Sequence, residues 1–104
     1  MPLPPMKAET TSALPLKAVI SAVSDISRWR LLKELASGEP RMVVDLATRI
    51  GQTDNNTAKH LHVLMKVGIV ERWNRLFRLA ERFRPVPGSQ EIDFGVCVLR
   101  LDRF

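Results

Sequence analysis

The segment from Asp45 to Val70 constrains the fold of this chain more than any other stretch. Its first part is apolar-periodic and stops at Gly51, a short polar turn follows, and a second periodic part runs from Asp54 to Gly68. Apolar residues spaced three and four apart predict amphipathic helices, and a glycine just after the last periodic residue is a common helix stop. Two helices joined by so short a turn predict a helix-turn-helix motif.

The second of these helices, expected over residues 54–67, has two chemically different sides. At about 100° per residue, one side collects Thr57, Ala58, Leu61, Leu64 and Met65, and the other collects Asn55, Lys59, His62 and Lys66. Amide and ammonium groups on one stripe can pair with adenine, guanine or phosphate. On an isolated helix the same stripe would be typical of a solvated face. The preceding helix, the tight turn and the basic segment that follows favour contact with nucleic acid.

The charge of the chain also favours contact with nucleic acid. Sixteen Lys and Arg residues stand against 11 Asp and Glu, which gives a net charge of +5 over 104 residues. The excess is concentrated on residues 59–84, whereas residues 8–46 are roughly balanced. A basic patch of this kind suits a polyanionic partner.

The rest of the chain predicts one domain over residues 14–104. Residues 1–13 carry Pro2, Pro4 and Pro5 and few groups able to pack, so we expect a disordered arm there. Further helices are expected at 14–23, 26–37 and 43–50, with Ser24 or Asp25 capping the second of these.

After Gly68 the pattern changes from helical to strand-like. Residues 69–73 and 76–79 predict a β-hairpin around Asn74 and Arg75, and residues 91–101 predict one longer strand. Residues 80–83 could continue the hairpin strand or form a helical turn. The expected fold class is therefore mainly α with a small β-sheet (α+β): four helices, a hairpin wing and an extra C-terminal strand.

Three motifs along the chain resemble the ArsR-like family of bacterial repressors. Residues 22–32, Ala-Val-Ser-Asp-Ile-Ser-Arg-Trp-Arg-Leu-Leu, resemble that family's opening Ala-Leu-Ser-Asp-Pro-Thr-Arg-Leu-Arg-Ile-Leu. Residues 45–47 with Gly51 are similar to its Glu-Leu-Ala…Gly helix, and residues 59–70 are similar to its Arg-His-Leu-x-x-Leu…Ala-Gly-Leu-Val signature. The resemblance covers residues 18–79, and it implies a winged helix-turn-helix fold and double-stranded DNA as partner.

The chain departs from that family at its metal site. Metal-sensing members place Cys-Val-Cys before the turn, where this chain has Met42-Val43-Val44. His60 and His62 do not compensate, because two residues apart on a helix they point about 200° from each other. Cys97 is the only cysteine and lies in an apolar run, which is typical of a structural thiol. We therefore expect no metal ion and no cofactor. Thr57 also stands where the family has a core valine.

The residues expected to bind DNA lie on the second helix and the wing. Asn55, Asn56 and Lys59 are the expected base contacts, Thr53 or Asp54 the helix cap, and His62 part of the polar stripe. His60 is left open between a phosphate contact and helix packing. The wing contributes Arg72, Asn74, Arg75 and Arg78 to the backbone or minor groove, unless the hairpin face is simply solvated. Arg41 and Arg49 flank the turn and could contact phosphate, but the expectation for both is a solvated side chain.

These observations predict a sequence-specific, repressor-like regulator of transcription that binds double-stranded DNA. The alternative is a winged-helix module that docks other proteins. An enzyme is not expected, since no phosphate loop, nucleophile elbow or clustered acid pair occurs. With no stretch long enough for a membrane span and a proline-broken start, the expected location is the cytoplasm.

We also expect a homodimer. The first helix carries an apolar stripe of Leu16, Val19, Ile20 and Val23, and the 91–101 strand is apolar on both faces, so each calls for cover from outside the domain. The alternative is a monomer in which this strand completes a three-stranded wing.

Overall fold

The structure, a computed structural model, describes residues 15–101; the arm expected over residues 1–13 lies outside the described part of the chain. The elements follow in the order α2 (Leu16–Val23), α3 (Ile26–Leu35), β1 (Arg41–Met42), α4 (Val43–Ile50), α5 (Asp54–Val67), β2 (Val70–Trp73), β3 (Leu76–Leu79), the 3-10 turn η1 (Glu81–Phe83), β4 (Glu91–Asp93) and β5 (Val98–Arg100). The expected mainly α fold with a small β component is confirmed. The open question at residues 80–83 resolves to the helical turn.

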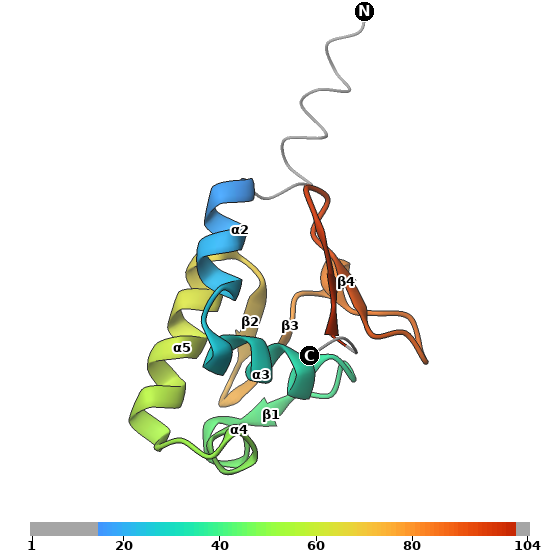
Figure 1. Cartoon of the computed structure of the whole chain (residues 1–104). Helices are drawn as coiled ribbons and strands as arrows, with labels where there is room; N and C mark the ends of the chain where they lie inside the picture. Colours follow the sequence, from blue (N-terminus) through green and yellow to red (C-terminus); the bar gives the residue numbers. More distant parts are fainter. Residues whose placement is uncertain (1–14, 102–104) are drawn as a thin grey trace, which may run out of the picture.

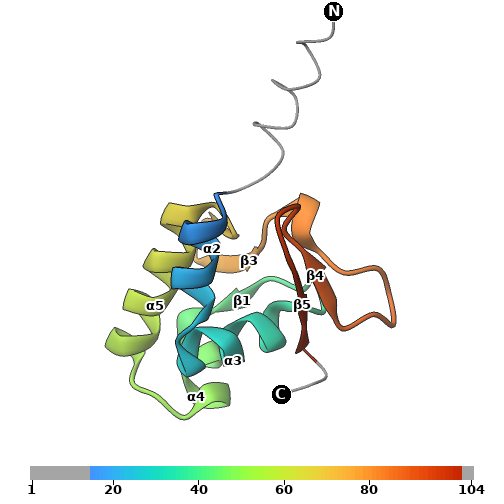
Figure 2. The same ribbon diagram turned by 45° about the horizontal axis from the view of Figure 1, so that its top comes forward.

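The four helices surround one apolar core, and the strands close its other sides (Figures 1 and 2). Helix α5 packs along α2, α3 and α4. Its buried side chains, Leu61 and Leu64, meet those of α3 and α4 in a single cluster. The fully buried members of this cluster from the helices are Val19, Leu31, Leu32, Leu35, Leu46 and Leu64. These are the apolar positions at helical spacing, so burial follows the periodicity.

Local signals set the helix boundaries as expected. Asp25 caps α3, because its carboxylate accepts hydrogen bonds from the backbone N–H groups of Ser27 and Arg28. Thr53 caps α5 by accepting from the N–H of Asn56 at 3.1 Å. Between α4 and α5, Gly51 adopts φ +72, a left-handed conformation that ends α4 within one residue and turns the chain. The predicted helix-turn-helix is confirmed over residues 43–67.

The wing is a three-stranded sheet in the order β1-β3-β2 rather than a bare hairpin. Strand β1 pairs antiparallel with β3, with Arg41 opposite Phe77 and Met42 opposite Leu76. No strand was expected at residues 41–42, because two residues are too short to show a period. The predicted hairpin turn is present, with Asn74 at φ +60 as the first of its two turn residues.

The prediction of one long strand over residues 91–101 is wrong. The segment folds back on itself as a hairpin, with Asp93 opposite Val98 and a turn between them. The Asp93 carboxylate accepts from the N–H of Gly95 at 2.8 Å, and Gly95 adopts φ +88, which favours glycine. The turn shifts the alternation of side chains, so Ile92, Phe94 and Leu101 all face the core.

This hairpin explains why residues 91–101 are apolar at positions that a single strand would place on both of its faces. The Phe94 ring packs on Phe83 with 5.2 Å between centroids, and both side chains are buried. The hairpin lies on the opposite side of the domain from α5 in both views (Figures 1 and 2). It thus completes the core of one chain, and the dimer argument built on this segment no longer holds.

Replacing Thr57 with valine should raise the free energy of unfolding by about 1 kcal/mol. Thr57 is fully buried on α5, and its Oγ1 has no hydrogen-bond partner in the described structure. Valine removes this desolvated hydroxyl and keeps the branched shape. Urea unfolding followed by circular dichroism measures the change.

Ser27→Ala is the matched control for Thr57→Val, since Ser27 is also buried but its Oγ accepts from Gln52 Nε2 at 2.7 Å. Loss of that hydrogen bond should lower the free energy of unfolding. A Thr57→Val protein less stable than the parent would mean that the hydroxyl has a partner.

Candidate nucleic-acid interface

The outer side of α5 carries the polar stripe expected from its sequence. Asn55, Asn56, Lys59, His62 and Lys66 are all exposed. The Thr53 cap leaves the first turn of the helix ordered and its amide side chains free to point outward. The described stripe from Asn55 to Lys66 contains no carboxylate, and Asp54 lies at its start. The helix therefore presents amide and cationic groups on a rigid element.

His60 is held by the protein itself. Its side chain is half-buried, and Arg28 Nη1 lies 3.1 Å from His60 Nδ1. Because a guanidinium can only donate, Nδ1 accepts and the ring proton sits on Nε2. Arg28 also donates from Nε to the carbonyl of Ala22, so one side chain joins α2, α3 and α5. The structure shows His60 in helix packing, and its contact with phosphate stays a prediction.

The wing presents its arginines on two different faces. Arg72 lies opposite Phe77 on the face of the sheet that meets the helices, with its guanidinium carbon 5.9 Å from the Phe77 ring centroid. Arg75 lies in the exposed turn. Arg78 lies on the other face, where its Nε donates to Glu71 at 3.0 Å. The structure places Arg72 and Arg75 beside α5, with Asn74 in the exposed turn between β2 and β3, and Arg78 on the other face of the sheet.

Trp73, the last residue of β2, is 61% exposed. It lies opposite Leu76, which in turn lies opposite Met42 on β1, so the three form one row across the outer face of the sheet. The register with β1 creates this row, and no spacing within the chain reveals it.

Arg49 is exposed, as expected, whereas Arg41 is half-buried, and both form ion pairs. Arg49 Nε donates to Asp45 at 3.1 Å, and Arg41 Nη1 donates to the other oxygen at 3.2 Å. The Arg49 guanidinium, assisted by Arg41, holds the pKa of the Asp45 carboxyl below its usual range, and Asp45 raises the pKa of Arg49 in return. These groups brace α4 and do not add free cations to the interface.

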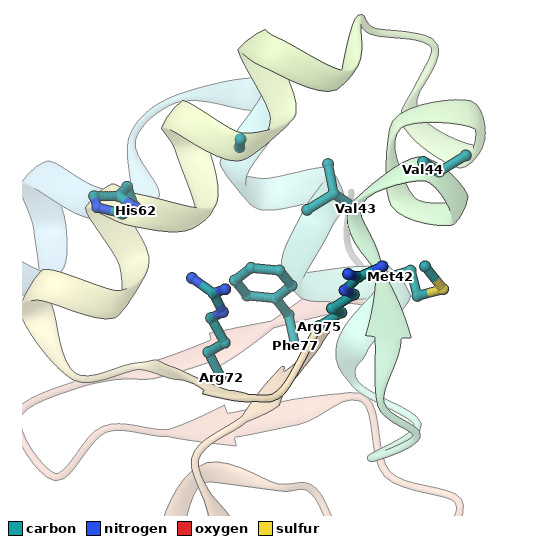
Figure 3. Close-up of a pocket in the computed structure, with 8 residues that line it drawn as sticks. Met42, Val43, Val44, His62, Arg72, Arg75 and Phe77 are labelled. Atoms are coloured by element: carbon teal, nitrogen blue, oxygen red, sulfur yellow. The ribbon is translucent and has the colours of Figure 1, made fainter.

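A cleft of about 370 Å³ lies between α5 and the wing. Ala58 and His62 form its α5 wall, residues 42–44 its α4 side, and Phe77 with Arg72 and Arg75 its wing side. Figure 3 shows the Arg72 guanidinium extending beside Phe77 toward α5, and Val43 pointing down from α4. Ala58 was expected on the buried stripe, but it is exposed in this cleft. Sequence periodicity missed the cleft because its walls come from two helices and from the three strands of the wing.

The four residues expected at a dimer interface divide into two kinds. Leu16 is 48% exposed and Ile20 is 52% exposed, one turn apart on α2. Val19 is fully buried in the core of the chain and therefore has no surface to offer a partner, and Val23 is half-buried against the same core.

Two comparisons with known proteins agree with this architecture. Residues 23–72 match a family of helix-turn-helix domains. The fold is also similar to the NMR structure of the homodimeric winged helix-turn-helix DNA-binding domain (fragment 1–100) of a possible ArsR-family transcriptional regulator from Mycobacterium bovis, with 26% identity and a TM-score of 0.54. This chain has a winged helix-turn-helix domain that is similar to an ArsR-like one.

The likeness covers part of each molecule. It spans 62% of this chain and 63% of the M. bovis domain, so this chain matches less than two thirds of that structure's length. The family match ends at Arg72, so the wing turn and the C-terminal hairpin of the ArsR-like domain lie outside it. A comparison with curated proteins gave no match. Within residues 15–101, no helix is both long and apolar enough to cross a bilayer.

Proposed function

We propose that the ArsR-like domain binds double-stranded DNA and regulates transcription as a repressor, with α5 in the major groove and the wing on the backbone. The observation that carries this proposal is the exposed amide and cationic stripe of α5, which lies beside Arg72 and Arg75 of the wing. A helix with such a stripe can reach base edges, while guanidinium groups beside it can neutralise phosphates. The similarity to a DNA-binding domain of the same fold supports the proposal.

A second candidate is docking of another protein on the outer face of the wing. The row of Trp73, Leu76 and Met42, in which Trp73 and Met42 are exposed, favours it, because aromatic and methionine side chains are enriched at protein interfaces. Trp73 and Leu76 lie on the sheet face opposite to that of Phe77, whereas the Met42 end of the row also borders the cleft beside α5.

Selection of bound duplexes from a random library, followed by affinity measurements over a range of salt concentrations, tests the proposal. A sequence-specific binder should enrich one site and hold it about 10³-fold or more above random DNA. Failure to enrich any site, with equal affinity for all duplexes, would contradict sequence-specific regulation.

The wing makes a separate prediction. Replacing both Arg72 and Arg75 with alanine should lower affinity for all duplexes alike and reduce the slope of log K against log salt by about one for each lost phosphate contact. Fluorescence anisotropy at several salt concentrations measures both quantities. Arg82→Ala is the matched control, since Arg82 is exposed on η1 and stacks on Phe83 near the C-terminal hairpin. An unchanged slope in the double variant would place the wing away from the DNA.

We further propose that the ArsR-like domain is a homodimer that pairs through the exposed α2 face of Leu16 and Ile20. The M. bovis domain is homodimeric, and two large apolar side chains one helical turn apart are well placed for a symmetric contact. A dimer would present two α5 helices to successive major grooves of a palindromic site.

Sedimentation equilibrium at micromolar concentration tests this assembly. The parent should show about twice the chain mass of 11.8 kDa, and Ile20→Glu should show the single-chain mass. Ser21→Glu places the same charge on an exposed neighbouring position and should leave the dimer intact. A parent protein with the single-chain mass would exclude the dimer.

A further inference from the structure

The cleft between α5 and the wing has an apolar interior and a cationic rim. Met42, Val43, Val44, Ala58 and Phe77 supply apolar walls, and Met42 and Val44 are 45% and 57% exposed. Its volume of about 370 Å³ falls within the range of small-molecule sites. Exposed aliphatic and aromatic surface in a concave site is stabilised by a ligand that removes it from water.

The polar groups of the cleft are all able to bind an anion. Arg72, Arg75 and His62 are its other described lining residues, and none of the lining residues within 15–101 is a carboxylate. Arg72 uses Nε to donate to the carbonyl of Asn74 at 2.9 Å, which orients its guanidinium and leaves the terminal nitrogens available. Neither Arg72 nor Arg75 forms an ion pair with any residue that the structure describes. In Figure 3 the Arg72 guanidinium reaches toward α5 on one side of the Phe77 ring, and Arg75 is seen on the other side, near Met42.

We propose that this cleft binds a small apolar acid, an aromatic or branched aliphatic carboxylate, with its hydrocarbon part against Phe77, Val43 and Ala58 and its carboxylate on Arg72 and Arg75. Guanidinium groups bind carboxylates through parallel hydrogen bonds, which fixes the orientation of the ligand. The cation near the Phe77 ring also places the charged end of the ligand beside an aromatic wall.

A DNA strand would use only part of this cleft. A phosphodiester satisfies the two arginines but offers no hydrocarbon group to cover the exposed side chains of Met42 and Val44. A carboxylate with an apolar body satisfies both kinds of surface at once. The apolar walls together with the arginines, rather than the arginines alone, therefore indicate an apolar acid as the ligand.

Binding of the acid in the cleft should also change DNA affinity, an inference that rests on the proposed function. The acid and the DNA would share Arg72 and Arg75, and the ligand would stand between the wing and α5. Binding of the acid should therefore lower DNA affinity, as an inducer does for a repressor.

Calorimetric titration of the full chain with 2-naphthoate tests the site without DNA. We expect saturable binding with one ligand per chain, and much weaker binding of 2-naphthalenemethanol, which keeps the rings but lacks the charge. Equal binding of the neutral compound would overturn the anion site. Absence of saturation with 2-naphthoate up to millimolar concentration would overturn the proposal as a whole.

Two variants locate the binding. Ala58→Leu fills the cleft from an exposed helical position, and Arg72→Met with Arg75→Met removes the cations but keeps apolar length. Each should weaken 2-naphthoate binding about tenfold or more, whereas Arg82→Met should bind like the parent. Circular dichroism confirms that each variant is folded. Unchanged binding by folded Ala58→Leu would place the ligand elsewhere and overturn the site.

Anisotropy with the selected duplex then separates the two proposals. A fall in DNA affinity with added 2-naphthoate in the parent, but not in Ala58→Leu, supports competition in the cleft. Binding of 2-naphthoate with unchanged DNA affinity would overturn the competition. A protein that binds 2-naphthoate but no duplex would contradict the proposed function while supporting the ligand site.

Discussion

Replacing Phe94 with alanine is expected to lower the free energy of unfolding by about 3–5 kcal/mol. Phe94 is fully buried in the C-terminal hairpin, and its ring packs on Phe83 at 5.2 Å. Truncation would open a cavity between this hairpin and the rest of the core. Because small domains are stable by about 5–15 kcal/mol, much of the margin would be lost. Urea unfolding followed by circular dichroism, at one fixed protein concentration, measures the change.

Two further variants keep this prediction testable if Phe94→Ala does not fold. Phe94→Leu retains part of the ring volume and should lose less stability than Phe94→Ala. Val98→Ala lies on the same hairpin with its side chain 50% exposed, and it should change the free energy of unfolding by no more than about 0.5 kcal/mol. If Phe94→Ala and Val98→Ala are equally mild, the hairpin is not part of the core.

Replacing Asn56 or Lys59 with alanine should weaken binding to the selected duplex by about 1–3 kcal/mol each. Both side chains are exposed on the first two turns of α5, and the Thr53 cap holds that end of the helix in place. Asn56 should matter less for random DNA, because an amide–adenine pair depends on sequence. Lys59 should matter for both kinds of DNA if it also contacts phosphate.

Anisotropy titrations with the selected and the random duplex, at one salt concentration, measure these losses. Arg82→Ala is again the matched control, since it removes a positive charge from the side of the C-terminal hairpin. Parent-like affinity in both Asn56→Ala and Lys59→Ala would mean that α5 does not read the site.

Local sequence alone predicted the helical part of this domain. The apolar spacing and caps of residues 43–67 reproduce α4 and α5 at their observed bounds, because these signals act between residues a few positions apart. The exposed stripe of α5 followed for the same reason. So did the wing turn at Asn74, whose conformation depends on neighbouring residues.

Contacts between distant segments decided the rest. Strand β1 exists because β3 pairs with it, and Arg78 is ion-paired because the register places it opposite Glu71. The C-terminal segment alternates like one strand, yet the Asp93–Gly95 turn and the packing of Phe94 on Phe83 fold it back. The Asp-x-Gly sequence was the local signal for that turn. Whether the segment turns there or continues as one strand depends on which side chains the core buries.

The candidate site shows the same division. The sequence by itself determined which side of α5 is polar and that the following residues are basic, because both are properties of one element. Only the tertiary structure decided that Arg28 engages His60, that Ala58 is exposed, and that Arg72 and Arg75 border an apolar cleft. Each of these depends on how α3, α4, α5 and the wing pack together, and that packing is a sum of long-range contacts that no spacing along the chain encodes.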